Sequence, residues 1–151
     1  MSDLDLILTR RMAVAPARLW RCWTEPALIE QWFAPHPVTV RDVVIDLRPG
    51  GEFSSLMTLP DGTEIRNAGC LLVVEPVRRL VFTDCLGPGF RPMDKPFFSA
   101  EVRFEADGAG TIYTARAIHG TKATRDAHAE MGFHEGWGAV ATQLEAVAAG
   151  L

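Results

Sequence analysis

The strongest pattern in the chain is an apolar stripe near its C-terminus. After Gly132, apolar residues recur at spacings of four and three, the period that places side chains on one face of an α-helix. A helix over residues 133–149 would span about 25 Å at roughly 1.5 Å per residue. A shorter helical piece is expected before it, from near Ala123, with Asp126 as its cap and Gly132 as the interruption. The stripe consists of Phe133, Trp137, Val140, Leu144, Val147 and Leu151.

The first part of the chain predicts one strand and two short helices. Apolar and polar residues alternate over residues 4–14, which indicates a half-buried strand. Pro16 suits the first turn of a helix, so residues 16–23 predict a short helix. A second one is expected over residues 26–33, with Thr24 as its N-cap.

After residue 37 the pattern changes to short β-like runs separated by turn residues. Gly69, inside one of these runs, is expected to mark a bulge or the close approach of another element. Residues 86–96 carry two glycines and three prolines and form a loop longer than a hairpin needs, which makes them a candidate lid. The expected strands are residues 38–47, 53–59, 63–74, 79–85, 97–106 and 111–117.

The order of these elements predicts the fold class. Short connections between consecutive strands favour an antiparallel sheet, and a sheet with one apolar face needs one covering layer. We therefore expect an α+β fold in which a curved antiparallel sheet of about six to seven strands wraps around the long C-terminal helix. A length of 151 residues suits one domain over residues 1–151, which leaves the oligomeric state open between a monomer and a homodimer paired through an edge strand.

Charge and composition exclude several classes of function. A net charge of −4 argues against a nucleic-acid partner, which requires a basic face. No apolar run approaches the roughly 18 residues of a membrane span, and the acidic N-terminus is unlike a secretory signal, so a cytoplasmic location is expected. Cys22, Cys70 and Cys85 are widely spaced and odd in number, which predicts reduced structural thiols rather than disulfides or a zinc site.

Motifs spread over nearly the whole chain resemble one known family. They are Ala13-Val14-Ala15-Pro16, Leu19-Trp20, Trp23-Thr24-Glu25-Pro26-Ala27-Leu28, Trp32-Phe33-Ala34-Pro35, Asp46-Leu47-Arg48-Pro49-Gly50-Gly51, Pro60-Asp61-Gly62, Gly69, Glu75-Pro76, Arg79-Leu80, Met131-Gly132-Phe133 and Gly136-Trp137. Together they resemble the C-terminal domain of activators of the heat-shock-protein-90 ATPase, a branch of the START-like, birch-allergen-like superfamily also called SRPBCC.

The resemblance implies a helix-grip fold with a cavity between the curved sheet and the C-terminal helix. The superfamily includes lipid carriers, hormone receptors, aromatic cyclases and dehydratases, so fold alone does not select a function. The co-chaperone that gives the family its name joins a similar domain to an N-terminal one that binds the chaperone. No such domain precedes the motifs here, so binding of a chaperone protein is a secondary alternative.

A cavity of this kind would bind a small apolar or aromatic molecule, because ligand pockets are mainly apolar with a few polar groups. The same residues could instead fill the core, as aromatic side chains usually do. His134 and either Arg66 or Arg103 are the expected polar groups. The expected lining residues are Trp32, Phe33, Phe53, Met57, Phe82, Phe90, Phe133, His134 and Trp137.

Catalysis is the alternative to simple binding. A cyclase or hydrolase-like activity would need an inward-facing acid or base, and Asp84, Glu64, Glu101 and His119 are candidates whose direction depends on strand register. The sequence contains no nucleophile elbow and no phosphate-binding loop. A binding protein is therefore favoured over an enzyme, and no cofactor is expected.

Metal binding is not favoured. His134-Glu135 begins like a zinc-protease motif, but position 138, where the second histidine belongs, is Gly138. His128, Glu130 and His134 form a looser group that is better explained as solvated helix surface.

Gly132 and Gly136 stand one turn apart in the predicted helical region and cost about 1 kcal/mol each relative to alanine inside a helix. They either let Trp32 or a strand approach closely or leave room for a ligand.

Overall fold

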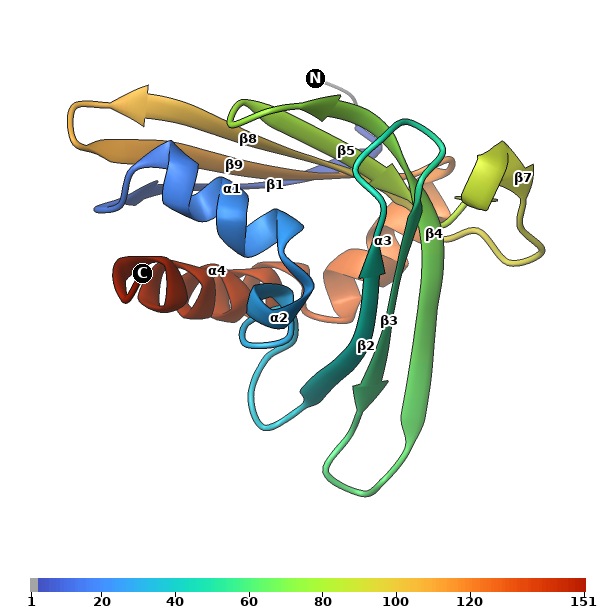
Figure 1. Cartoon of the computed structure of the whole chain (residues 1–151). Coiled ribbons are helices and arrows are strands. Elements are labelled where there is room, and N and C mark those ends of the chain that lie inside the picture. The colour runs from blue at the N-terminus through green and yellow to red at the C-terminus, as the bar shows by residue number, and fades with distance from the viewer. Residues whose placement is uncertain (1–2) are drawn as a thin grey trace.

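The structure is a computed structural model that describes residues 3–151. Within these residues, seven strands form one antiparallel sheet (Figure 1). Its order is β1-β9-β8-β5-β4-β3-β2. The single domain predicted from the sequence covers residues 1–151, and residues 1–2 of it lie outside the described residues. The strands of this sheet are β1 (Asp5–Met12), β2 (Thr39–Ile45), β3 (Glu52–Thr58), β4 (Glu64–Glu75), β5 (Arg79–Thr83), β8 (Ser99–Asp107) and β9 (Gly110–Ile118).

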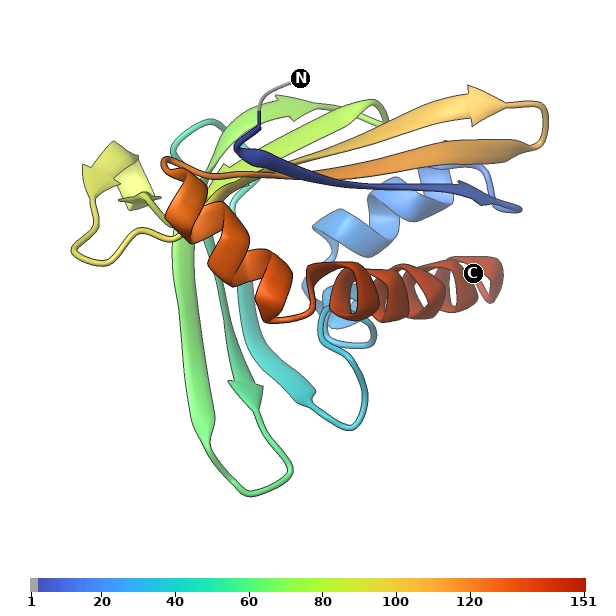
Figure 2. The same cartoon turned by 180° about the vertical axis from the view of Figure 1, so that it is seen from behind.

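Four α-helices lie on the concave side of this sheet in the described residues (Figures 1 and 2). They are α1 (Pro16–Thr24), α2 (Pro26–Ile29), α3 (Lys122–Glu130) and α4 (Phe133–Ala149). The C-terminal helix α4 contacts α1 and β1 and runs below them in Figure 1. The predicted α+β helix-grip fold, with two short helices after the first strand, is therefore confirmed.

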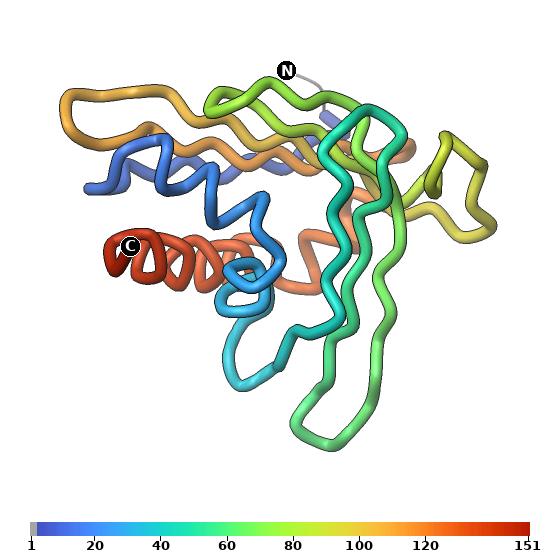
Figure 3. The backbone as a smooth tube through the Cα atoms, viewed as in Figure 1, coloured from blue at the N-terminus to red at the C-terminus, as the bar shows by residue number. Residues whose placement is uncertain are grey.

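The sheet bends strongly, so that β2, β3 and β4 run across the direction of β1, β8 and β9 (Figure 3). Two irregularities in register accompany the bend, one in β2 between Arg41 and Val44 and one in β4 between Leu71 and Val73. Gly69 lies beside them, and a Cβ atom there would collide with the carbonyl oxygen of Thr83 on β5. The glycine thus permits the close approach expected from its place inside a strand.

One end of the concave face is a filled core. Met12 of β1, Phe104 of β8 and Leu144 of α4 are buried in a single apolar cluster with Leu19 of α1. Leu144 has no exposed surface, which places the middle of the predicted apolar stripe against the sheet. The stripe is shorter than predicted, because α4 ends at Ala149 and leaves Leu151 exposed.

Two of the expected helix caps are wrong. Thr24 belongs to α1, and its hydroxyl donates to the carbonyl oxygen of Trp20 rather than capping α2. The second helix ends at Ile29, before the predicted residue 33. Asp126 lies inside α3, where Thr121 is the N-cap and accepts from the backbone N–H of Thr124.

The convex face carries a network of ion pairs that decides the direction of two candidate polar residues. Glu101 accepts from Arg79 Nη1 at 2.7 Å and from Arg103 Nε at 3.1 Å. Their neighbours on β8, Ala100 and Val102, are buried on the opposite face. Strand alternation therefore points Glu101 and Arg103 away from the concave side, and neither lines the cavity considered below.

Residues 86–96 hold a small separate hairpin. It consists of β6 (Leu86–Gly87), the 3₁₀ turn η1 (Pro88–Phe90) and β7 (Arg91–Pro92), and it projects from the side of the sheet (Figure 1). Within residues 3–151, no helix combines the length and the apolar character needed to cross a membrane.

Candidate functional site

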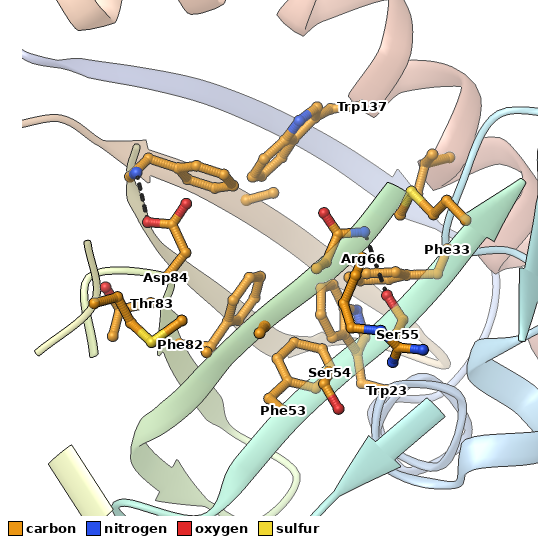
Figure 4. Close-up of a pocket in the computed structure, with 18 of the residues that line it drawn as sticks. Trp23, Phe33, Phe53, Ser54, Ser55, Arg66, Phe82, Thr83, Asp84 and Trp137 are labelled. Carbon is orange, nitrogen blue, oxygen red and sulfur yellow. Dashed lines mark hydrogen bonds between the residues drawn. The ribbon is translucent and has the colours of Figure 1, made fainter. Parts of the chain in front are cut away.

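A cavity of about 620 Å³ lies between the curved half of the sheet and the helices (Figure 4). Strands β3, β4 and β5 form one side, and α1, α4 and the segment after α2 form the other. Aromatic and aliphatic side chains dominate its walls. They are Trp23, Trp32, Phe33, Phe53, Met57, Phe82, Met93, Phe98, Tyr113, Ala115, Trp137 and Val140.

The aromatic rings of the wall support one another edge to face. Trp23 contacts Trp32 at a centroid distance of 4.8 Å, and Phe53 contacts Phe82 at 4.9 Å. Phe33 links the two pairs, since it lies 5.8 Å from Trp23 and 5.7 Å from Phe53. Such edge-to-face pairs add roughly 0.5–1.5 kcal/mol each beyond area burial, so the wall is a stable surface even where it faces open space.

Hydrogen bonds attach this wall to the helices. Trp32 Nε1 donates to the carbonyl oxygen of Cys22 in α1 at 2.9 Å. Gln143 of α4 donates through Nε2 to the carbonyl oxygens of Trp32 and Ala34, and its Oε1 accepts from the backbone N–H of His36. The segment after α2 is thus held by two helices at once.

Behind the cavity wall, the indole N–H of Trp23 is buried and makes no hydrogen bond of good geometry within residues 3–151. It interacts with the hydroxyl of Tyr113: burial raises the pKa of that phenol, and the indole N–H of Trp23 opposes the rise. Both side chains line the cavity, and an unpaired buried donor costs about 1–3 kcal/mol.

Polar groups gather on the β3, β4 and β5 side. Ser55, labelled in Figure 4, accepts from Asn67 Nδ2 at 3.4 Å, and both residues line the cavity. Asp84, directly after β5, also lines it. Its Oδ1 accepts from the backbone N–H groups of Phe97 at 2.8 Å and Phe98 at 3.1 Å.

Most of the residues expected to line the cavity do so. Trp32, Phe33, Phe53, Met57, Phe82 and Trp137 are on its surface, and of the two candidate arginines Arg66 lines it. Whether these residues bind a ligand stays a prediction.

Phe90, Phe133 and His134 are corrections. Phe90 is 49% exposed and packs its ring over Gly50 at the β2–β3 connection, because the small hairpin folds outward there. Phe133 is buried in a separate cluster with Leu6 and Ala117. His134 follows the buried Phe133 in α4, and its side chain is exposed rather than directed into the cavity.

The sequence interpretation missed part of the lining. Trp23, Tyr113, Ser55 and Asn67 line the cavity but are not among the lining residues expected from the sequence. One signal was available: Tyr113 and Ala115 share a face of β9, and the small Ala115 beside large aromatic residues leaves volume unfilled.

His119 and His128 form a second buried polar cluster, beside the cavity. The carbonyl oxygen of Leu4 accepts from His119 Nδ1 at 2.7 Å, so His119 Nε2 is the acceptor for His128 Nδ1 at 2.8 Å. Phe98 and Trp137 contact His128 and also line the cavity. Burial lowers the pKa of His128 to about 4, and electrostatic interaction with His119 adds to the effect.

The remaining chemical candidates do not form a site. Glu64 is exposed and paired with Arg41 at 2.7 Å. His128 is buried whereas Glu130 and His134 are exposed, and no group of three potential metal ligands occurs within residues 3–151.

The two helix glycines differ in role. Gly132 has φ of 90° and separates α3 from α4, a backbone conformation that favours glycine. Gly136 lies inside α4, and a Cβ atom there would meet nothing within 4 Å. No close approach of Trp32 or of a strand therefore requires Gly136, nor does it line the cavity.

Comparison with known proteins gives a family. A family model described as "Activator of Hsp90 ATPase homolog 1-like protein" matches residues 13–149. No curated protein sequence matches the chain.

Solved structures agree on the fold. The crystal structure of a Nitrosomonas europaea protein is 44% identical, with a TM-score of 0.94, and the match covers 97% of this chain and 95% of that one. A Mycobacterium smegmatis protein is 26% identical, with a TM-score of 0.80 and coverages of 96% and 90%. An AHSA1-like protein from Aeromonas hydrophila is 19% identical, with a TM-score of 0.69 and coverages of 95% and 90%, and supports the fold alone.

Proposed function

We propose, from the premise that this chain belongs to the activator of Hsp90 ATPase homolog 1-like family, that it binds a small aromatic or apolar molecule between the sheet and α4. The observation that carries the proposal is the cavity itself. Its volume of about 620 Å³ falls within the range of small-molecule sites, roughly 300–1,000 Å³, and apolar side chains, many of them aromatic, form most of its wall.

The shape of the cavity wall indicates one property of the ligand. The proposed ligand has an apolar body that packs against Phe33 and Phe53.

The test uses a neutral, polarity-sensitive dye, N-phenyl-1-naphthylamine. We expect its fluorescence to rise on binding and the emission of the cavity-lining residues Trp23, Trp32 and Trp137 to fall with the same midpoint. Dye that binds without a change in tryptophan emission would place the dye elsewhere on the protein.

A variant whose new side chain fills part of the cavity provides the control. Ser55→Phe projects a ring into the cavity from the centre of β3 and should weaken dye binding at least tenfold while the protein stays folded. Val44→Phe, at an exposed position of β2 that does not line the cavity, adds the same ring elsewhere and should leave dye binding unchanged. Equal dye affinity in both variants would contradict the proposal.

A further inference from the structure

Asp84 gives the cavity a fixed negative charge. We propose that the cavity is a site for an organic cation, an amine whose ammonium group meets Asp84 while its apolar body lies among the aromatic side chains. This inference rests on the proposed function and names the class of ligand for the same cavity.

The carboxylate of Asp84 is held in one orientation. Its Oδ1 accepts from the backbone N–H groups of Phe97 and Phe98, and the thiol of Cys85 lies 3.9 Å from the same oxygen. Its other oxygen, Oδ2, makes no hydrogen bond to any residue in the range 3–151 and points toward the interior of the cavity (Figure 4). One oxygen therefore positions the group, and the other is available to a ligand.

This negative charge lacks a counterion. No lysine, arginine or histidine nitrogen in residues 3–151 lies within 4.0 Å of the Asp84 carboxylate. Lys95 and Arg66 also line the cavity, but both are exposed and their charges are screened by water. A partly buried carboxylate is stabilised by a cation that reaches it, so a ligand ammonium supplies what the protein does not.

The surroundings of Asp84 also suit a cation. Phe82, Phe98 and Trp137 line the cavity with it, and Phe98 and Trp137 are in contact at a centroid distance of 5.8 Å. The faces of aromatic rings attract cations and give roughly 0.5–2 kcal/mol each, depending on desolvation. A fixed carboxylate beside such rings favours an ammonium group and disfavours an anionic one.

Three ligands that share one body test the inference: 4-phenylbutylamine, 4-phenylbutanol and 4-phenylbutyrate. Isothermal titration calorimetry with the whole chain at pH 7 compares a cation, a neutral molecule and an anion of nearly equal size. We expect the amine to bind at least tenfold more tightly than the alcohol, and the carboxylate to bind most weakly.

Two variants assign the preference to one residue. Asp84→Asn removes the charge but keeps a side-chain oxygen that can accept from Phe97 and Phe98, and it should abolish the preference for the amine. Asp94→Asn removes the other carboxylate that lines the cavity and should leave the preference intact. Near-ultraviolet circular dichroism checks that both variants keep the native packing.

The outcomes separate the two proposals. If the alcohol binds as tightly as the amine, or the carboxylate binds best, the cation site is wrong while the cavity still binds apolar molecules. If Asp94→Asn rather than Asp84→Asn abolishes the preference, Asp84 is not the site. If none of the three ligands binds, the cation site is wrong, and the proposed function fails with it only if the dye also does not bind in the cavity.

Discussion

At one end of the concave face, α1 and α4 pack directly on β1, β8 and β9. At the other end, β3, β4 and β5 face a cavity. Similar aromatic pairs occur in both places: Trp20 and Phe104 meet edge to face at 5.9 Å in the filled half, and Phe53 and Phe82 meet edge to face at 4.9 Å in the open half. The two ends differ because the sheet bends away from α4 beyond β5 (Figure 3). The helices therefore pack on β1, β8 and β9 but leave a space in front of β3, β4 and β5.

The largest expected contrast comes from removing side-chain volume. Leu144→Ala, in the filled half, should lower the free energy of unfolding by about 2–5 kcal/mol, because a fully buried leucine leaves a void that the packed surroundings cannot fill. Met57→Ala, on the cavity wall, should cost about 1 kcal/mol, since Met57 already borders open space. Urea unfolding of both variants measures the difference, and equal losses would show that the two halves are packed alike.

Acid should act on the buried histidine pair beside the cavity, at His128. Its pKa is about 4 in the folded chain against 6.5 in the unfolded chain, so the unfolded state binds the proton first as pH falls. Stability should therefore decrease between pH 6.5 and pH 4, by about 3 kcal/mol in total from this group.

The measurement for His128 is the free energy of unfolding at pH 7 and pH 4.5. His128→Asn keeps a donor for His119 Nε2 but does not titrate, so its loss on acidification should be smaller than that of the natural protein by about 2 kcal/mol. His134→Asn, at an exposed position, is the control and should leave the loss unchanged. Identical pH profiles for all three proteins would remove His128 as the cause.

Adding a ring at two equally buried small residues tests the same contrast in the opposite direction. Ser55 on the cavity wall and Ala141 in the filled half are each 2% exposed. Ala141→Phe should destabilise the protein by about 1–3 kcal/mol or more through overpacking. Ser55→Phe should cost less than about 1 kcal/mol, because the ring enters open volume. Melting temperatures that fall equally would mean that the cavity is not available to a side chain.

The smallest effect concerns the two glycines at the start of α4. Gly136→Ala should raise the free energy of unfolding by about 0.5–1 kcal/mol, because alanine favours the helix and its Cβ meets nothing within 4 Å. Gly132→Ala, one turn earlier, should lower it by about 1 kcal/mol, because φ is 90° there. Chemical unfolding of the pair should give opposite signs.

The fold could be predicted from sequence because its signals are local. Periods of two and of about 3.6 residues, together with turn residues at Pro60-Asp61-Gly62, locate the strands and the long helix without knowledge of contacts. The errors at Thr24 and Asp126 arose because several residues near each helix start can cap it, and only the backbone selects one.

The site was less predictable because it depends on where the sheet bends. Phe53 and Phe90 look alike in sequence, yet one lines the cavity and the other covers Gly50 outside it. Asp84 could be recognised as a candidate but not assigned a direction, since the backbone donors that orient it come from Phe97 and Phe98, more than ten positions away. Strand register and long-range hydrogen bonds fix such details, and neither is visible in a local pattern.

The hydrogen bonds of Gln143 couple one wall of the cavity to α4 and so restrict how the cavity can widen. Because one side chain of α4 bonds to Trp32, Ala34 and His36, the segment that carries Trp32 and Phe33 cannot swing outward by itself while these bonds persist. A bulky guest has to displace that segment and α4 together, away from β3 and β4, and α4 is packed into the filled core through Leu144. Under the proposed function, the upper limit on ligand size would therefore be set by the packing around Leu144, at the opposite end of α4 from the cavity.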